Sequence, residues 1–184
     1  SAHSALLVHM IPILVWKGQA EVVAPVVISI MAFGALPLRF LFGYLSDVWP
    51  RQKVASAGMA VGGLSVLVLL ASNGAFWQLV VFAVMLSFAE SVSSVTWALI
   101  GDFFGRLSFA TLRGGVTTVY SVFAMATPVY AGWVFDRTES YTWALAPLVL
   151  LYGAATLLFW VLPKPKVPER LRGQVAEPQP AEDD

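Results

Sequence analysis

Three side chains that could take part in chemistry lie inside long apolar runs of the sequence: His9, Arg39 and Glu90. A guanidinium binds a carboxylate through a planar fork of two hydrogen bonds. A carboxylate in hydrocarbon must be paired, protonated or exposed to water, and an imidazole titrates near physiological pH. These residues are therefore candidates for an anion-binding site, with Glu90 and His9 as candidates for proton coupling.

The composition around these residues indicates a membrane protein. The chain has 184 residues, of which 58% are hydrophobic and 12% are charged. That charged fraction is about half of what a soluble domain carries. The net charge of zero does not indicate nucleic-acid binding, and the absence of cysteine excludes disulfides and thiolate metal sites. Two histidines six residues apart are too few for a metal site.

Five apolar runs are long enough to span a bilayer as helices, which takes about 20 mostly apolar residues. They cover residues 22–45, 54–72, 76–100, 114–134 and 141–162. A sixth run, residues 5–16, is too short to span, and no basic segment precedes it as in a signal peptide. We expect it to be the end of a truncated helix. The transmembrane bundle is thus expected over residues 1–162, followed by a disordered tail, residues 163–184, that is rich in proline and charge.

The basic residues of the loops predict the orientation. If the runs alternate across the membrane, only Lys17 and Arg137 fall on one side, and eight basic residues fall on the other. These eight are Arg51, Lys53, Arg106, Arg113, Lys164, Lys166, Arg170 and Arg172. Cytoplasmic loops carry the excess of basic residues. We therefore expect a multi-pass protein of the cell membrane with a cytoplasmic C-terminus.

Glycines in the run 54–72 predict close helix packing. Gly58 and Gly62 are four residues apart, and Gly63 follows directly. Small residues at this spacing let two membrane helices approach closely. We interpret them as packing residues without a role in chemistry.

Residues 43–53, GYLSDVWPRQK, resemble the loop signature of the major facilitator superfamily. The matching positions are Gly43, Leu45, Asp47 and Arg51. The positions that depart from it are Val48, Pro50 and Gln52, with Lys53 standing one step late. In this superfamily the signature lies between helices 2 and 3 and, in weaker form, between helices 8 and 9. Five full spans and a cytoplasmic tail fit helices 8 to 12. The resemblance therefore implies the C-terminal six-helix bundle of a twelve-helix fold, with its first helix truncated.

Three further stretches resemble the branch of the monocarboxylate transporters and the oxalate:formate antiporter. They are LVHMIPIL (7–14), ALIGDFFGRLSFATLRGG (98–115) and PVYAGWVFDRTESYTWAL (128–145). In that branch an arginine at the position of Arg39 binds the substrate carboxylate, and the preceding residue, often glycine, is Leu38 here. The antiporter has a second membrane cation on its eleventh helix, which the run 114–134 lacks. A single cation suits a substrate with one carboxylate.

The resemblance implies a secondary active transporter of a small monocarboxylate or related organic anion that works by alternating access. Its expected partners are the lipid bilayer, the missing N-terminal half and a proton as a candidate co-substrate. The sequence has no Ser-His-Asp arrangement, phosphate-binding loop, dinucleotide fingerprint or metal-ligand cluster. We therefore expect neither enzymatic activity nor a cofactor. Two alternatives stay open: a transporter of another solute, such as a drug or a sugar, and a non-transporting assembly or sensor protein.

Each candidate side chain also has a structural interpretation. Arg39 is expected roughly 10 Å and Glu90 roughly 15 Å from the cytoplasmic ends of their helices, so they lie within about one turn of the same depth. They could form a static ion pair, or Arg39 could snorkel to water and Glu90 could be a neutral acid. His9 could be a packing residue.

Charged residues at the cytoplasmic end form a second candidate set. The resemblance implies a gate latch made of Gly43, Asp47, Arg51, Lys53, Asp102, Arg106 and Arg113. Asp47 is expected near the first turn of the eleventh helix, where N–H groups are free. That helix is expected to begin at Gly114 and Gly115. The alternative is that these charges serve only to orient the chain.

Overall fold

The computed structural model describes residues 2–105 and 108–163, which form seven helices and no strand. The helices are α1 (Ala2–Val8), α2 (Met10–Trp16), α3 (Val23–Val48), α4 (Arg51–Ala71), α5 (Phe76–Phe104), α6 (Phe109–Thr138) and α7 (Thr142–Val161). The five helices from α3 to α7 are long and apolar enough to cross a membrane. This confirms the predicted all-α membrane fold. The predicted disordered tail lies, except for Pro163, outside the described residues.

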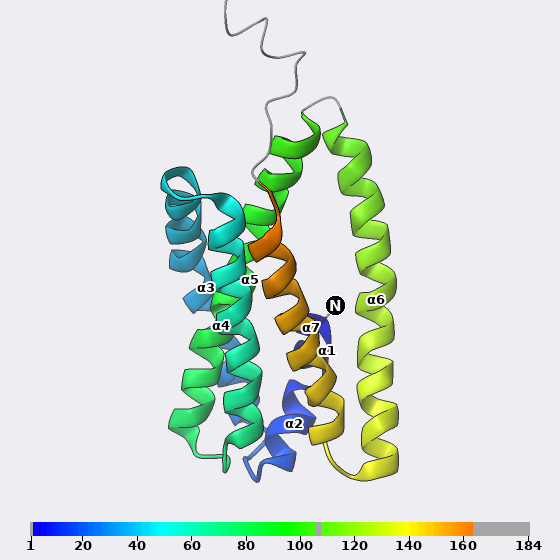
Figure 1. Cartoon of the computed structure of the whole chain (residues 1–184). Coiled ribbons are helices and arrows are strands. Elements are labelled where there is room, and N and C mark those ends of the chain that lie inside the picture. Colours follow the sequence, from blue (N-terminus) through cyan, green and yellow to red (C-terminus); the bar gives the residue numbers. More distant parts are fainter. Residues whose placement is uncertain (1, 106–107, 164–184) are drawn as a thin grey trace, which may run out of the picture.

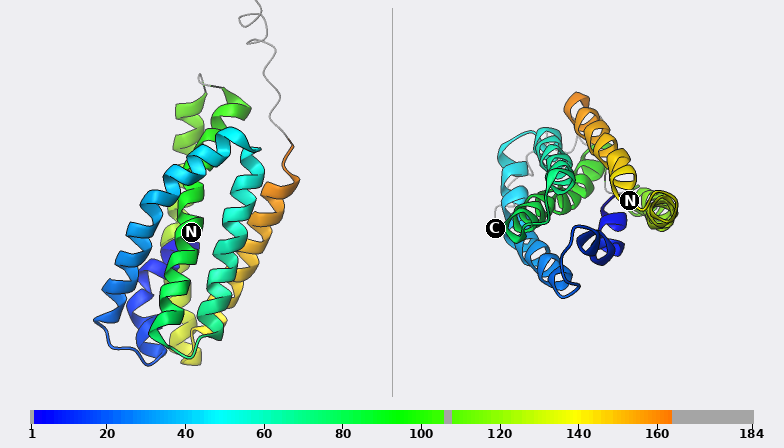
Figure 2. Two further views of the ribbon diagram at one scale, coloured as in Figure 1. Left: turned by 90° about the vertical axis from the view of Figure 1, so that its left-hand side faces the viewer. Right: turned by 90° about the horizontal axis from the view of Figure 1, so that it is seen from below.

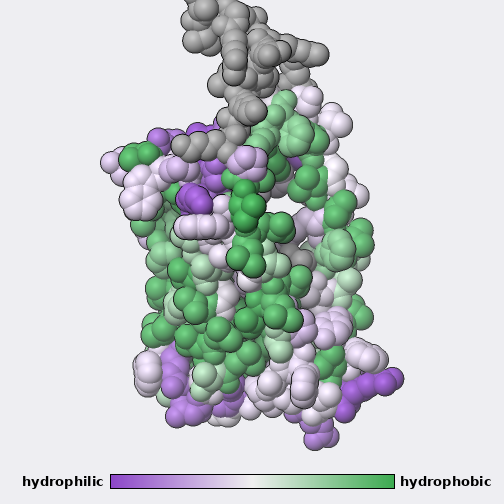
Figure 3. Space-filling model, in the orientation of Figure 1, coloured by the Kyte–Doolittle hydropathy of each residue, from purple (hydrophilic) through white to green (hydrophobic). Residues whose placement is uncertain are grey.

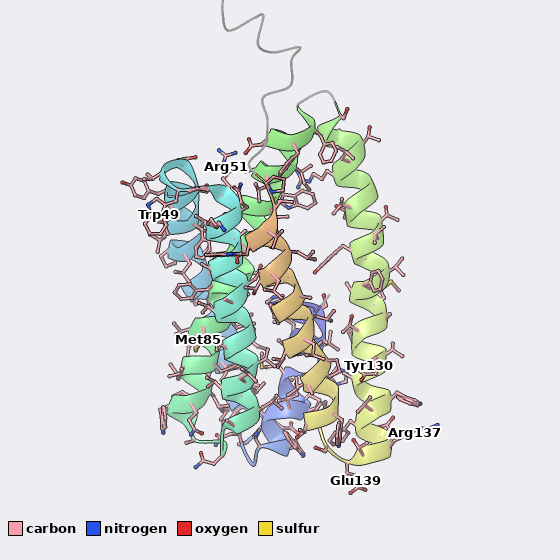
Figure 4. All side chains as sticks on the ribbon, viewed as in Figure 1. Trp49, Arg51, Met85, Tyr130, Arg137 and Glu139 are labelled. Atoms are coloured by element: carbon pink, nitrogen blue, oxygen red, sulfur yellow. The ribbon has the colours of Figure 1, made fainter. Side chains whose placement is uncertain are left out.

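The long helices run up and down, so that the links between them alternate between two ends of the bundle (Figure 1). The α3–α4 and α5–α6 links lie at the end that we call the Arg51 end. The α2–α3, α4–α5 and α6–α7 links lie at the opposite end, which we call the Lys17 end. Figure 4 labels Arg51 at one end and Arg137 and Glu139 at the other. The helices therefore place the described loop residues on the two sides that the sequence predicts.

The surface has the distribution of polarity that a membrane-spanning bundle requires. On the face shown in Figure 3, hydrophobic side chains form a broad band across the middle of the molecule, and hydrophilic side chains gather at both ends. Hydrocarbon can surround such a band without leaving polar groups unsatisfied, because the helices satisfy their own backbone groups.

Close packing of α4 against α5 forms the centre of the fold. A Cβ atom added to Gly58 would lie 2.3 Å from Val92 Cγ2, and one added to Gly62 would lie 2.6 Å from Ala89 Cβ. Real Cβ atoms do not approach so closely, so both positions need glycine. The predicted small-residue packing is confirmed.

The helices extend past the apolar runs that predicted them. The fourth helix begins at Arg51, before the run 54–72, and α5 continues to Phe104. The prediction that a helix begins at Gly114 and Gly115 is wrong, because α6 begins at Phe109. A hydrophobic run marks the thickness of the hydrocarbon, whereas helical hydrogen bonding can continue into the polar interface.

The run 5–16 forms two short helices that are divided at His9. Pro12 has no N–H group and cannot bond to the carbonyl of Val8, so the regular helix is interrupted there. Backbone bonds from His9 N to Ala5 O (3.0 Å) and from Ile13 N to His9 O (2.8 Å) continue on both sides of the break. The break presents the His9 side chain where two helices meet.

The sixth helix lies at the outer edge of the bundle, beside α1 and α7, in the end-on view of Figure 2. Most of its apolar side chains are exposed, including Val119, Phe123, Met125 and Val129. The third helix likewise exposes Phe33 and Phe40. Exposed apolar surface on this scale marks a lipid-facing or protein-facing surface.

Hydrogen bonds at the Lys17 end hold the link before α3 against the link between α4 and α5. Lys17 Nζ donates to the carbonyls of Leu70 (3.0 Å) and Ser72 (2.7 Å), and Gln19 donates to that of Gly74 (2.7 Å). Burial lowers the pKa of the Lys17 ammonium. These bonds join the α2–α3 link to the α4–α5 link.

Candidate functional site

Arg39 of α3 and Glu90 of α5 lie in contact. Arg39 Nη2 donates to Glu90 Oε1 at 2.9 Å. The two side chains are 48% and 29% exposed, so the ion pair is open on one side instead of sealed in the core. A ligand carboxylate could therefore reach the guanidinium without unfolding the bundle.

A row of hydrogen bonds between α3 and α5 sets the position of this pair. Ser87 Oγ donates to the carbonyl of Met31 at 2.9 Å, and Ser91 Oγ donates to that of Ala35 at 3.4 Å. Met31, Ala35 and Arg39 are spaced by four residues and so lie on one face of α3. The serines hold that face against α5, and Glu90 precedes Ser91 directly. The local packing thus presents Arg39 to the carboxylate.

His3 is a third member of this cluster, and it is not among the candidate residues predicted from the sequence. Its Nε2 lies 2.9 Å from Glu90 Oε2, and its Nδ1 is buried without a hydrogen-bond partner among the described residues. The signal that could have found it is helical spacing. His3 is three residues before Leu6 and seven before Met10, and both of these are fully buried.

Two hollows meet at Glu90 and His3. The first, of about 380 Å³, lies among α4, α5, α6 and α7 and is also lined by Tyr120 and Tyr152. The second, of about 440 Å³, lies between α1, α3 and α5 and is also lined by Arg39. Mostly apolar walls with a few convergent polar groups are typical of small-molecule sites.

His9 lies apart from this cluster. Its Nε2 is 2.9 Å from the carbonyl of Pro128, and its Nδ1 is 3.1 Å from the hydroxyl of Tyr141. A carbonyl can only accept, so Nε2 carries the hydrogen and the neutral ring accepts from Tyr141 at Nδ1. Among the described residues, the hydrogen-bond partners of the His9 side chain are Pro128 and Tyr141, and they do not include Arg39 or Glu90. It connects the α1–α2 break to α6 and to the start of α7.

Replacing His9 by phenylalanine is expected to destabilise the bundle. Phenylalanine keeps an aromatic ring against Tyr141 and removes both hydrogen bonds. Hydrogen bonds between membrane helices contribute about 1–2 kcal/mol in model systems. Thermal unfolding of the purified full-length protein in detergent should show a lowered Tm. Val8→Ala, at an exposed neighbouring position, is the control and should leave the Tm nearly unchanged. An unaltered Tm in His9→Phe would contradict the connecting role.

Three of the predicted gate residues, Asp47, Arg51 and Asp102, form one compact ion cluster. Arg51 Nη1 donates to both carboxylate oxygens of Asp102 at 2.8 Å, and Nη2 donates to Asp47 at 3.4 Å. This cluster joins the ends of α3 and α5 to the start of α4. The sequence predicted a contact of Asp47 with the first turn of α6. The hydrogen bonds of the described residues do not include it, and they give Arg51 as the polar partner of Asp47. Arg106 lies outside the described residues.

The other predicted gate residues contact tryptophans or open space. Lys53 Nζ donates to the carbonyl of Trp160 at 3.0 Å and lies 3.4 Å from the centroid of its ring. The guanidinium of Arg113 lies 5.1 Å from the centroid of a Trp97 ring. A Cβ atom added to Gly43 would meet nothing within 4 Å. Lys53 and Arg113 therefore join helices at the Arg51 end through cation–π contacts.

Within the described residues, no group of three or more His, Asp or Glu side chains is placed to hold a metal ion. What the site offers is one guanidinium, one carboxylate and one imidazole in apolar walls at mid-bundle. That arrangement can bind an anion and exchange a proton.

The family model described as the Major Facilitator Superfamily matches residues 7–183. The chain therefore belongs to the major facilitator superfamily, and it is a multi-pass membrane protein of a transporter family.

Individual relatives are distant transporters. The chain is 28% identical to the uncharacterized transporter YycB of Bacillus subtilis, over 71% of this chain and 32% of the relative. It is 29% identical to a triacylglyceride transporter of Mycolicibacterium smegmatis, over 88% of this chain and 28% of the relative. It is 26% identical to the monocarboxylate transporter 6 of Homo sapiens, over 74% of this chain and 28% of the relative. The matches thus span no more than a third of these proteins.

Proposed function

We propose that the chain is the C-terminal six-helix half of a secondary transporter that moves a small monocarboxylate or related organic anion by alternating access. The observation that carries this proposal is the half-exposed Arg39 guanidinium, bound to Glu90 beside a hollow of about 440 Å³. An intramembrane charge of this kind is by default a functional group. The likeness to a monocarboxylate transporter supports the choice of substrate class.

In this proposal Arg39 exchanges one carboxylate for another. The substrate carboxylate takes the place of Glu90 Oε1 on the guanidinium and gains a bidentate, charge-assisted contact. Glu90, released from Arg39, and His9 are candidates for the group that takes up a proton. Rocking of the two six-helix halves then exposes the site to the other side.

We also assign roles in transport to the other parts of the chain. The missing N-terminal half covers the exposed apolar faces of α3 and α6. The Arg51 end faces the cytoplasm, in the cell membrane, and residues 163–184 form a cytoplasmic tail. The gate residues of the Arg51 end stabilise the closed cytoplasmic side, with the Arg51–Asp102 pair as their centre. The proposal needs no cofactor and no nucleic acid.

Transport by the full-length protein in proteoliposomes tests the substrate class. We expect saturable uptake of radiolabelled L-lactate, and weaker uptake of the dianion oxalate because the described site holds one guanidinium. Glucose and tetraphenylphosphonium should be taken up no faster than by protein-free liposomes. Uptake of glucose or of the cation without L-lactate would replace the proposal by another transporter class. Absence of transport for every probe would favour an assembly or sensor role.

A further inference from the structure

We propose that His3 is the proton-binding residue of the Arg39–Glu90 site, so that one anion and one proton bind together. This inference rests on the proposed function, because it specifies the co-substrate of the same site. Its starting point is the double contact of Glu90. One carboxylate oxygen contacts Arg39 Nη2 and the other contacts His3 Nε2, both at 2.9 Å. Glu90 therefore responds to the charge of either neighbour.

The free nitrogen of His3 provides a position for the proton. A carboxylate accepts hydrogen bonds, so Nε2 carries a hydrogen toward Glu90 in the neutral ring. Nδ1 is then a buried lone pair without a partner among the described residues. A proton can be added there without breaking a hydrogen bond that the structure contains.

The net charge of the site links this proton to the substrate. With neutral His3, the charges of Arg39 and Glu90 cancel. A bound monocarboxylate adds one negative charge, and a proton on His3 Nδ1 restores neutrality. An uncompensated charge in an apolar site is strongly disfavoured. Each ligand therefore raises the affinity of the site for the other, by the same factor.

Two fixed charges face His3 in these hollows. The ionisable side chains that share the two hollows with it are Arg39 of α3, Glu90 of α5, Tyr120 of α6 and Tyr152 of α7. The side chain that α4 contributes there is Met59. The tyrosines are neutral near pH 7. The fixed charges that face the imidazole in these hollows are thus those of Arg39 and Glu90.

The covalent change in the cycle is the formation and breaking of one N–H bond at His3 Nδ1, with a hydronium ion as the proton donor and water as the final acceptor. The proton comes from water on the side where the anion enters. It remains on His3 while the anion occupies Arg39, and it returns to water on the other side when the anion leaves. Glu90 then pairs with Arg39 again. The coupled step carries one anion and one proton and moves no net charge with them.

The decisive variant is His3→Gln in the full-length protein, because glutamine can still donate to Glu90 but does not titrate. In weakly buffered detergent solution, a pH-indicator dye should report about one proton taken up per bound L-lactate in the wild type and none in the variant. In proteoliposomes, accumulation driven by a proton gradient should be lost, while L-lactate counterflow at equal pH persists. Val8→Ala, at an exposed position of the same helix, should behave as the wild type in all three assays.

Three results would overturn the inference. They are a wild type that takes up no proton with L-lactate, proton uptake that persists in His3→Gln, and loss of counterflow together with accumulation in that variant. The last would show a merely structural role. If His3→Gln does not elute as a folded protein in size-exclusion chromatography, His3→Asn is judged by the same criteria.

The variant Glu90→Gln provides an independent test of the coupling. Arg39 then carries an uncompensated charge, so L-lactate should bind without proton uptake and its uptake should lose its dependence on pH. An unchanged pH profile would remove Glu90 from the coupling. The proposed function is tested separately by the substrate panel, and it is refuted if the wild type does not transport L-lactate. The inference about His3 fails only after that panel has succeeded.

Discussion

Replacing Arg39 by alanine in the full-length protein is expected to abolish L-lactate uptake. In the proposed transport cycle the substrate carboxylate replaces Glu90 on Arg39, and removal of one partner from a hydrogen-bonded charge pair that is closed off from water costs about 2–5 kcal/mol. A loss of that size lowers the apparent affinity by about 30-fold to several-thousand-fold. The substitution also leaves His3 as the remaining side-chain partner of the Glu90 carboxylate among the described residues. Initial rates of uptake across a range of L-lactate concentrations would measure the change.

Arg39→Lys separates charge from geometry. Lysine keeps the positive charge but lacks the planar fork that holds a carboxylate by two bonds. We expect it to transport L-lactate weakly, with a raised KM. Arg137→Ala is the matched control, because Arg137 lies at the Lys17 end over the ring of Trp133. Normal uptake in both Arg39 variants would refute the carboxylate-receptor role.

A double variant distinguishes receptor from static ion pair. If Arg39 served only to neutralise Glu90, uptake lost in Arg39→Ala would return in Arg39→Ala/Glu90→Gln, where neither charge remains. If Arg39 binds the substrate, the double variant stays inactive. Recovery of uptake in the double variant would therefore show that Arg39 and Glu90 form a static ion pair.

Replacing Gly62 by leucine is expected to prevent the bundle from packing. Even the Cβ atom would lie 2.6 Å from Ala89 Cβ and 2.9 Å from Tyr152 Cε1. The alanine cannot move aside without moving α5, and Glu90 is the next residue along that helix. Overpacking of this kind typically costs about 1–3 kcal/mol for a small insertion, and leucine adds more than one methylene. We expect Gly62→Ala to lower the Tm and Gly62→Leu to abolish folded protein in size-exclusion chromatography.

Gly153→Ala is the matched control for this prediction. A Cβ atom at Gly153 would meet nothing within 4 Å, although the residue also lies in the interior of a membrane helix. Alanine in a helix interior is favoured over glycine by about 0.5–1 kcal/mol. The Tm of Gly153→Ala should therefore equal or exceed that of the wild type. A Tm of Gly62→Ala equal to that of Gly153→Ala would show that α4 and α5 do not need the close approach.

Much of the fold could be predicted from the sequence, because hydropathy is a local property. A run of about 20 apolar residues predicts a membrane helix whatever surrounds it, and all five predicted runs lie within or nearly within helices α3 to α7. The ends of these helices could not be predicted as well. At Arg51 and Phe109 the helices begin in residues that the apolar runs leave out.

The candidate site could be predicted in part. The depths of Arg39 and Glu90 follow from counting residues along each helix, and they indicate that the two could meet. The same count could not find His3, whose inward orientation depends on how α1 packs. Nor could it give His9 its partners, Pro128 and Tyr141, which come from other helices.

The sequence by itself determined the class of protein, the number of membrane helices and the alternation of the loops, because each depends on the polarity of consecutive residues. Only the tertiary structure decided which charges meet. Arg39 and Glu90 are 51 residues apart in the chain, as are Arg51 and Asp102. Whether such residues meet depends on the rotation of each helix about its axis, which is set by packing contacts such as those of Gly58 and Gly62 with α5.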